Sequence, residues 1–161
     1  MKKILHGILA AAAVAAMASA AQAASTVTST FQTQITIEDD CEITSPTDMN
    51  FGSVGLLNSN VDATSTFVVR CTENTDYTIA LDNGQNASGG TSRMANSDGT
   101  KFVTYELYQD SGRTTLWDDT NTVSSTGTGV DQTFTVYGRV PPQATPPAGT
   151  YTDTVTITVT Y

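Results

Sequence analysis

The stretch Tyr151-Thr-Asp-Thr-Val-Thr-Ile-Thr-Val-Thr-Tyr161 (YTDTVTITVTY) decides the fold class of this chain. Every even-numbered residue in it is a threonine, whereas Val155, Ile157, Val159 and Tyr161 share the opposite face. A two-residue period built from β-branched and aromatic residues is typical of a β-strand. We therefore predict a strand here, with these four side chains in the core.

The same alternation recurs upstream, and turn residues separate the alternating runs. We expect strands over residues 63–72, 76–82, 101–108 and 130–140. Glycine, asparagine and proline pairs between these runs favour tight turns, and no stretch after residue 23 has a helical period. The sequence predicts an all-β protein, a single antiparallel β-sandwich without a linker that divides it.

The N-terminal 23 residues have the pattern of a signal peptide. Lysines follow the initial Met1, residues 4–20 form an alanine-rich apolar run, and Ala21-Gln22-Ala23 is a small-x-small cleavage pattern. We expect cleavage between Ala23 and Ala24. A transmembrane helix is less favoured, because alanine dominates the run and no basic cluster follows it.

Composition excludes several classes of function. The 161-residue chain has a net charge of −9, so its surface repels nucleic acid and anionic lipid. Its one histidine, His6, would leave with the signal peptide, which excludes a histidine base. We find no calcium-loop motif and no placed pair of catalytic carboxylates. For Trp117, core packing is the default over a surface contact with sugars. We expect no enzyme, no metal and no cofactor.

The two cysteines, Cys41 and Cys71, are predicted to form one disulfide, because export would place them in an oxidising compartment. The alternative of a free nucleophilic cysteine lacks a histidine that could activate it.

The segment Ala24 to Ile37 also alternates, with Val27, Phe31, Ile35 and Ile37 on one face. It contains no proline, no glycine and no charge before Glu38, so as an exposed edge it would promote aggregation. Two interpretations stay open. The segment is either the first strand of its own sandwich, or a strand that pairs with another molecule.

The ordered motifs of this chain resemble the spore coat U domain proteins, which include subunits of archaic (Csu-type) chaperone–usher pili. The resemblance covers essentially all residues after the signal peptide. The motifs that carry it are Phe51-Gly52, Val69-Arg-Cys-Thr72, Tyr77-Thr-Ile-Ala-Leu81, Arg93-Met94, Tyr105-Glu-Leu-Tyr108, Leu116-Trp117, Val136-Tyr-Gly-Arg-Val-Pro141 and Ala148-Gly-Thr-Tyr-Thr-Asp-Thr-Val155.

This resemblance implies an immunoglobulin-like sandwich that lacks its last strand. A periplasmic chaperone lends a strand, which the N-terminal strand of another subunit replaces at the outer-membrane usher. The implied division is a signal peptide (1–23), a donor strand segment (24–37) and a pilin domain (38–161). The donor residues would be Val27, Phe31, Ile35 and Ile37, although Ile37 could instead belong to the subunit's own first strand. Val155, Ile157, Val159 and Tyr161 would border the acceptor groove.

The implied function is that of a structural subunit of a surface pilus that supports adhesion and biofilm formation. Its partners would be identical or related pilin subunits, the chaperone and the usher, with the membrane contacted only through the usher. Two alternatives remain: a structural protein of a spore or envelope coat, and a self-complete secreted binding module.

Overall fold

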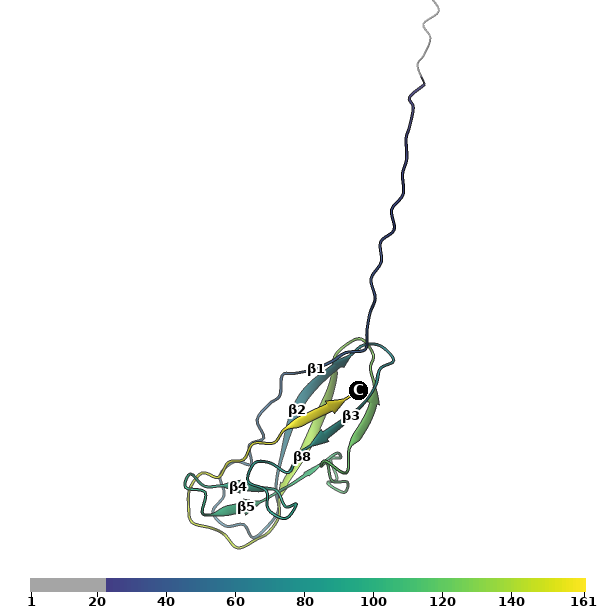
Figure 1. Ribbon diagram of the computed structural model, residues 1–161. Coiled ribbons are helices and arrows are strands. Elements are labelled where there is room, and N and C mark those ends of the chain that lie inside the picture. The colour runs from purple at the N-terminus through teal and green to yellow at the C-terminus, as the bar shows by residue number, and fades with distance from the viewer. Residues whose placement is uncertain (1–22) are drawn as a thin grey trace, which may run out of the picture. The chain divides into compact units, whose positions relative to one another are not determined.

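A computed structural model describes residues 23–161 (Figure 1). The expected signal peptide therefore lies almost wholly outside the described residues, and Ala23 is the first residue described. The chain divides into a unit that ends at Ile35 and a domain from Thr36 to Tyr161. Within the described range, no helix is sufficiently long and apolar to span a membrane.

The domain is all-β and antiparallel, as predicted. Across residues 36–161 the strands are β1 (Cys41–Thr44), β2 (Val61–Cys71), β3 (Asp76–Leu81), β4 (Arg93–Ala95), β5 (Phe102–Thr104), β6 (Glu106–Tyr108), β7 (Val123–Thr126), β8 (Gln132–Val140) and β9 (Ile157–Thr160). One sheet has the order β1-β2-β8-β6, a second has the order β7-β3-β9, and β4 pairs with β5 (Figure 1).

The core lies between the two larger sheets. β2 and β8 form the longest ladder, which runs from the pair Val61↔Val140 to the pair Val69↔Gln132. Alternate residues of each strand point inward because side chains in a strand have a period of two. The buried residues that these strands and β3 contribute are Phe67, Val69, Cys71, Val136, Val140, Tyr77, Ile79 and Leu81.

Trp117 is a core residue. Its side chain is 3% exposed, and its indole Nε1 donates a hydrogen bond to the Ile79 carbonyl at 3.0 Å. The indole ring also packs against Phe67, with 5.9 Å between the ring centroids. The core interpretation of Trp117 is therefore correct, because the ring and its one donor are both satisfied inside the protein.

The predicted strand over 101–108 is two strands. β5 pairs with β4, whereas β6 pairs with β8, and Tyr105 lies between them. The Tyr105 amide donates to the Ser92 carbonyl, and this is the last backbone hydrogen bond on the β4 side before the chain passes to β6. The alternating pattern continues through this switch because both halves bury the same face.

The C-terminal stretch is regular only over β9. Residues 152–156 do not form a continuous ladder. They are held by isolated backbone hydrogen bonds, such as the two that Ala95 and Thr152 exchange. The prediction that Tyr161 is a core residue was wrong, since its side chain is 56% exposed. Tyr161 lies beyond Thr160, which is the last β9 residue paired with β3, and its hydroxyl donates to Asp40 at 3.1 Å.

Candidate functional site

Two free strand edges meet on one side of the sandwich. In the part of the chain that the structure describes, β1 pairs with β2 and β9 pairs with β3, and neither has a neighbour on its other edge. The hydrogen bond between Tyr161 and Asp40 brings the end of β9 next to the start of β1. Free edges normally attract another strand, because their N–H and C=O groups lack partners.

A groove of about 980 Å³ lies between the segment after β1 and the segment before β9. One wall is formed by residues 46–55, and the other by residues 145–155. The side chains that form its floor belong to the core and include Phe67, Leu81, Val103, Leu107, Val136 and Val140. An occupant of the groove would therefore extend the hydrophobic core.

Among the four predicted groove residues, Val155 and Ile157 line the groove, whereas Val159 and Tyr161 do not. Val159 is half-buried and packs against the core near the Cys41–Cys71 disulfide. The groove therefore occupies the half of the sandwich away from the disulfide. For Val159 and Tyr161 a role at the border of the groove stays a prediction, since β9 has a free edge and Tyr161 lies just beyond its last pair with β3.

The first wall, residues 46–55, is an irregular segment that is hydrogen-bonded to the four-stranded sheet. The Thr47 amide donates to the Thr66 carbonyl at 2.8 Å, and the Thr66 amide donates to the Thr47 hydroxyl at 2.8 Å. Further along, Met49 and Phe51 lie so close to Gly138 of β8 that a Cβ atom there would collide with both side chains. Glycine at this position lets the wall approach the sheet closely.

The two walls are joined at the end of the groove away from the disulfide. The Leu57 amide donates to the Thr145 hydroxyl at 2.9 Å, and the Gln143 amide donates to the Leu57 carbonyl at 3.0 Å. Next to this junction, Val54 and Leu56 are 53% and 66% exposed. This end of the groove thus carries apolar side chains that face water.

A buried polar contact fixes the second wall. The Tyr105 hydroxyl donates to Asp153 Oδ2 at 2.7 Å, while the Asn86 backbone and side-chain amides both donate to Asp153 Oδ1. Burial and the neighbouring Asp153 carboxylate raise the pKa of Tyr105, so its hydroxyl stays protonated and acts as a donor. Gly84 leaves the space for this contact, since a Cβ there would strike both Asp153 and Tyr105.

The segment from Ala24 to Ile37 has no strand assignment in the structure. Its apolar side chains are exposed: Val27 by 94%, Phe31 by 88%, Ile35 by 82% and Ile37 by 70%. This exposure disagrees with the interpretation of the segment as a buried first strand of its own sandwich. Ile37 lies outside that first strand as well, because β1 begins at Cys41.

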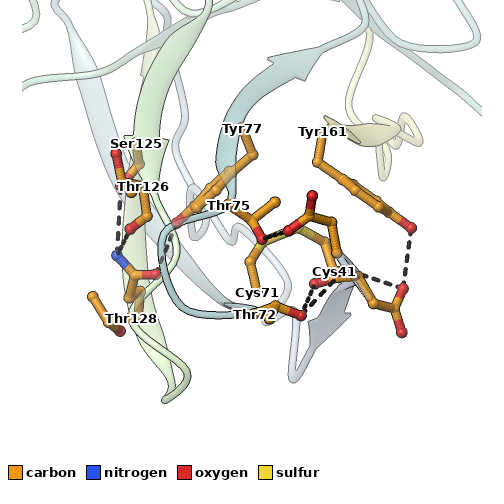
Figure 2. The surroundings of a disulfide bond; sticks show 12 residues. Cys41, Cys71, Thr72, Thr75, Tyr77, Ser125, Thr126, Thr128 and Tyr161 are labelled. Carbon is orange, nitrogen blue, oxygen red and sulfur yellow. Dashed lines mark hydrogen bonds between the residues drawn. A yellow bond between two sulfur atoms is a disulfide. The ribbon is translucent and has the colours of Figure 1, made fainter. Parts of the chain in front are cut away.

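The segment joins the domain at a dense set of contacts around the disulfide (Figure 2). Cys41 and Cys71, which face each other in the β1–β2 register, are linked by a disulfide. The Thr72 hydroxyl donates to the Glu38 carbonyl at 3.0 Å and accepts from the Asp40 amide at 3.2 Å. We call residues 38–41, with the residues that bind them, the root of the segment.

Several groove residues were missed by the sequence analysis. The sequence predicts no strand over residues 46–55 and 145–150, because glycine and proline interrupt the alternation of apolar and polar residues there. The contact between Tyr105 and Asp153 joins residues 48 positions apart, and no local pattern indicates it. Both residues do occur in the motifs on which the family resemblance rests.

The fold is an immunoglobulin-like sandwich with an open groove over its core. Similarity to known proteins identifies its family. The Spore Coat Protein U domain matches residues 27–158, so the chain belongs to the spore coat protein U domain family. The chain is 31% identical over 127 residues to Protein U of Myxococcus xanthus. The aligned region covers 70% of this chain and 71% of that protein.

A solved structure is similar as well. It is the CsuC–CsuE chaperone–tip adhesion subunit pre-assembly complex from the archaic chaperone–usher Csu pili of Acinetobacter baumannii. The match has a TM-score of 0.60 and 27% identity, and it covers 78% of this chain. This chain spans 40% of the chain that it matches.

Proposed function

We propose that this protein is a structural subunit of a chaperone–usher pilus that polymerises by donor-strand exchange. In this proposal the donor segment (residues 24–37) of one copy fills the groove of the next copy. The observation that carries it is that one chain combines an open groove over its core with an exposed, uncharged segment of alternating apolar residues. Strand addition of this kind takes affinity from the backbone ladder and specificity from alternate side chains.

The groove wall is long enough for two anchors of the segment. An extended strand rises about 3.3 Å per residue, so Val27 and Ile35 stand about 26 Å apart with Phe31 midway. The wall from Tyr151 to Ile157 spans at most about 20 Å on the same basis. Phe31 can therefore contact this wall together with either neighbouring anchor, and we propose Phe31 and Ile35 as the central pair.

The energy available is large enough to hold a fibre together. Burial of Phe31 and Ile35 contributes about 1.5–3 kcal/mol each, or roughly 3–6 kcal/mol before entropy costs, and burial of Val27 and Ile37 along the adjoining edge would raise this to roughly 6–12 kcal/mol. Each backbone hydrogen bond to the free edge of β9 adds about 1 kcal/mol net. The total is comparable to the stability of a small domain, so joining two subunits amounts to completing a fold.

An open groove needs a partner before polymerisation, because an exposed edge above an apolar core promotes aggregation. We propose a periplasmic chaperone for this role, followed by transfer at an outer-membrane usher. The similar Csu structure is itself a complex of a chaperone with a pilus subunit. Export would use residues 1–23 as a signal peptide, and the assembled pilus would support adhesion and biofilm formation. No step of this proposal requires catalysis or a cofactor.

A second candidate is a structural protein of a spore or envelope coat. The family description and the similarity to Protein U favour it. The same donor segment would then link copies into a layer without an usher. Genes for a chaperone and an usher beside the gene for this chain would favour the pilus, and their absence would favour the coat.

The test is an SDS gel of periplasm-exported protein, with unboiled and boiled samples side by side. Full-length protein should give a ladder that collapses on boiling, and deletion of residues 24–37 should abolish the ladder. Phe31→Asp should also abolish it, whereas Gln32→Asp places the same charge on the opposite face and should preserve it. A ladder that survives the deletion would overturn strand exchange through this segment.

A further inference from the structure

The root of the donor segment has a second role that the exchange of strands does not by itself require. We propose that the Cys41–Cys71 disulfide and the Thr72 and Thr75 hydroxyls form a mechanical anchor for the donor segment. This anchor would carry tension from the donor segment directly into β3 and keep it away from the groove wall over residues 46–55. The inference rests on the proposed function, since only a subunit linked through this segment is pulled there.

The root is bound on both its backbone and its side chains. Besides its two contacts with Thr72 described above, the root places the Asp40 carbonyl 2.9 Å from the Thr72 amide. The buried Thr75 donates its hydroxyl to Asp39 Oδ1 at 2.6 Å. Thr72 and Thr75 both belong to the turn between β2 and β3, so the root is fastened to this turn (Figure 2).

Without the disulfide, tension would act first on β1. Cys41↔Cys71 is the terminal pair of the β1–β2 ladder, so a pull on Cys41 would break that ladder one pair at a time from its end. β1 has only four residues, and the groove wall over residues 46–55 follows it directly in the chain. Peeling β1 would therefore drag this wall away from the groove and release whatever strand the groove holds.

The disulfide removes residues 42–70 from the loaded path. Tension that reaches Cys41 passes to Cys71, then through the turn at Thr72–Thr75 into β3. β3 is the central strand of its sheet and pairs with both β7 and β9. Because the free edge of β9 borders the groove, the load reaches the next copy's segment by way of β3 and β9.

The C-terminal strand is connected to the root directly as well. The Tyr161 hydroxyl donates to Asp40 Oδ1, so the end of β9 and the exit of the donor segment are held together (Figure 2). This contact joins Asp40, at the root, to the residue that follows β9. It also explains why an aromatic residue at the end of the alternating stretch faces Asp40 instead of the core.

In the experiment, a peptide of residues 24–37 fills the groove of the chain from Ala24 to Tyr161. Optical tweezers then pull on two handles, one at Ala24 of the chain and one at the C-terminal end of the bound peptide. We expect wild-type protein to keep the peptide until the whole domain unfolds. The Cys41→Ser/Cys71→Ser variant should instead lengthen in an early step at lower force, by up to about 70 Å, because the residue steps of about 3.5 Å between Cys41 and the start of β2 at Val61 become extensible. The peptide should leave in that same step.

A reduced wild-type sample and a Thr72→Val variant test the disulfide and the hydroxyl contacts separately. Reduction of the folded wild-type chain on the tether should reproduce the early step without any need to refold the variant. Thr72→Val removes the hydroxyl that binds Glu38 and Asp40, so the root should detach at lower force. Thr64→Val is the matched control, because Thr64 is exposed on β2 and has no side-chain bond among the described contacts.

Peptide release at the same force with and without the disulfide would overturn the anchor. A peptide that binds no sample at zero force would instead overturn the proposed strand exchange. In that case the early lengthening step of the cysteine variant, measured on a tether from Ala24 to Tyr161, still decides whether the disulfide shields β1 and the wall. Release at equal force and absence of binding are thus distinguishable outcomes.

Discussion

Phe31→Asp should separate folding of the subunit from joining of subunits. Because the Phe31 side chain is 88% exposed, its replacement should change the free energy of unfolding of the isolated chain by less than about 0.5 kcal/mol. In a joint, the variant loses about 2–3 kcal/mol of aromatic burial. It also buries a carboxylate over an apolar floor without a partner, which costs about 3 kcal/mol or more.

Together these effects weaken the joint by at least about 5 kcal/mol, which corresponds to a factor of roughly 10³–10⁴ in the dissociation constant. The assay titrates labelled peptides of residues 24–37 against protein that lacks this segment, with fluorescence anisotropy as the readout. Wild-type peptide should also raise the melting temperature of the protein, because it binds only the folded state.

Gln32→Asp is the matched control, since it adds the same charge one residue away on the face that should point outward. Its dissociation constant should stay within about tenfold of wild type. If Phe31→Asp and Gln32→Asp peptides bound equally well, burial of Phe31 in the groove would be refuted. If the Gln32→Asp peptide alone lost affinity, the strand would bind with its other face inward.

The remaining predictions concern the domain itself. Cys41→Ser with Cys71→Ser should lower the free energy of unfolding by about 3–4 kcal/mol in urea, and an unchanged midpoint would show that the disulfide is dispensable. Gly138→Ala should destabilise by about 1–3 kcal/mol and weaken peptide binding, because it displaces the first groove wall, whereas Gly149→Ala meets no atom within 4 Å. The Arg139 hydrogen bond lowers the pKa of Asp62 in the folded state, so the stability it contributes is present above about pH 4 and lost as the pH falls further. Accordingly, Asp62→Asn should destabilise at pH 7, and its difference from wild type should shrink below pH 4 in urea titrations.

Much of the sandwich could be predicted from the sequence, because strand alternation and burial have the same period. β2, β3 and β8 lie within or close to the predicted ranges, and their inward residues form the core. The alternating pattern predicts the face of a side chain but not its depth. Tyr161 shares the inward face of Val155 and Ile157, yet it lies past the last pair with β3 and is exposed.

The groove itself could not be predicted, because its walls depend on packing between distant segments. Residues 46–55 approach β8 closely because Gly138 leaves room there for Met49 and Phe51, and Thr66 of β2 binds Thr47 of the same wall. Likewise, the second wall depends on Asp153 reaching Tyr105 across the sandwich. In the sequence these segments show only interrupted alternation and turn residues, which are equally typical of surface loops.

The donor segment and the C-terminal stretch show that one sequence pattern can have two structural outcomes. Residues 24–37 and 151–161 alternate in the same way, with threonine or glutamine opposite apolar residues. Residue preference therefore cannot assign one of them to the core and the other to a partner. The available edges do so: β3 takes β7 and β9 as its two neighbours, and β2 takes β1 and β8. Free edges remain on β1 and β9, the groove lies between the segment that follows β1 and the segment that precedes β9, and the segment proposed as the donor is exposed. The proposed function thus rests on an edge that the domain leaves unpaired and on an exposed apolar segment, and the decisive property is the pairing of strands, which no single stretch of sequence contains.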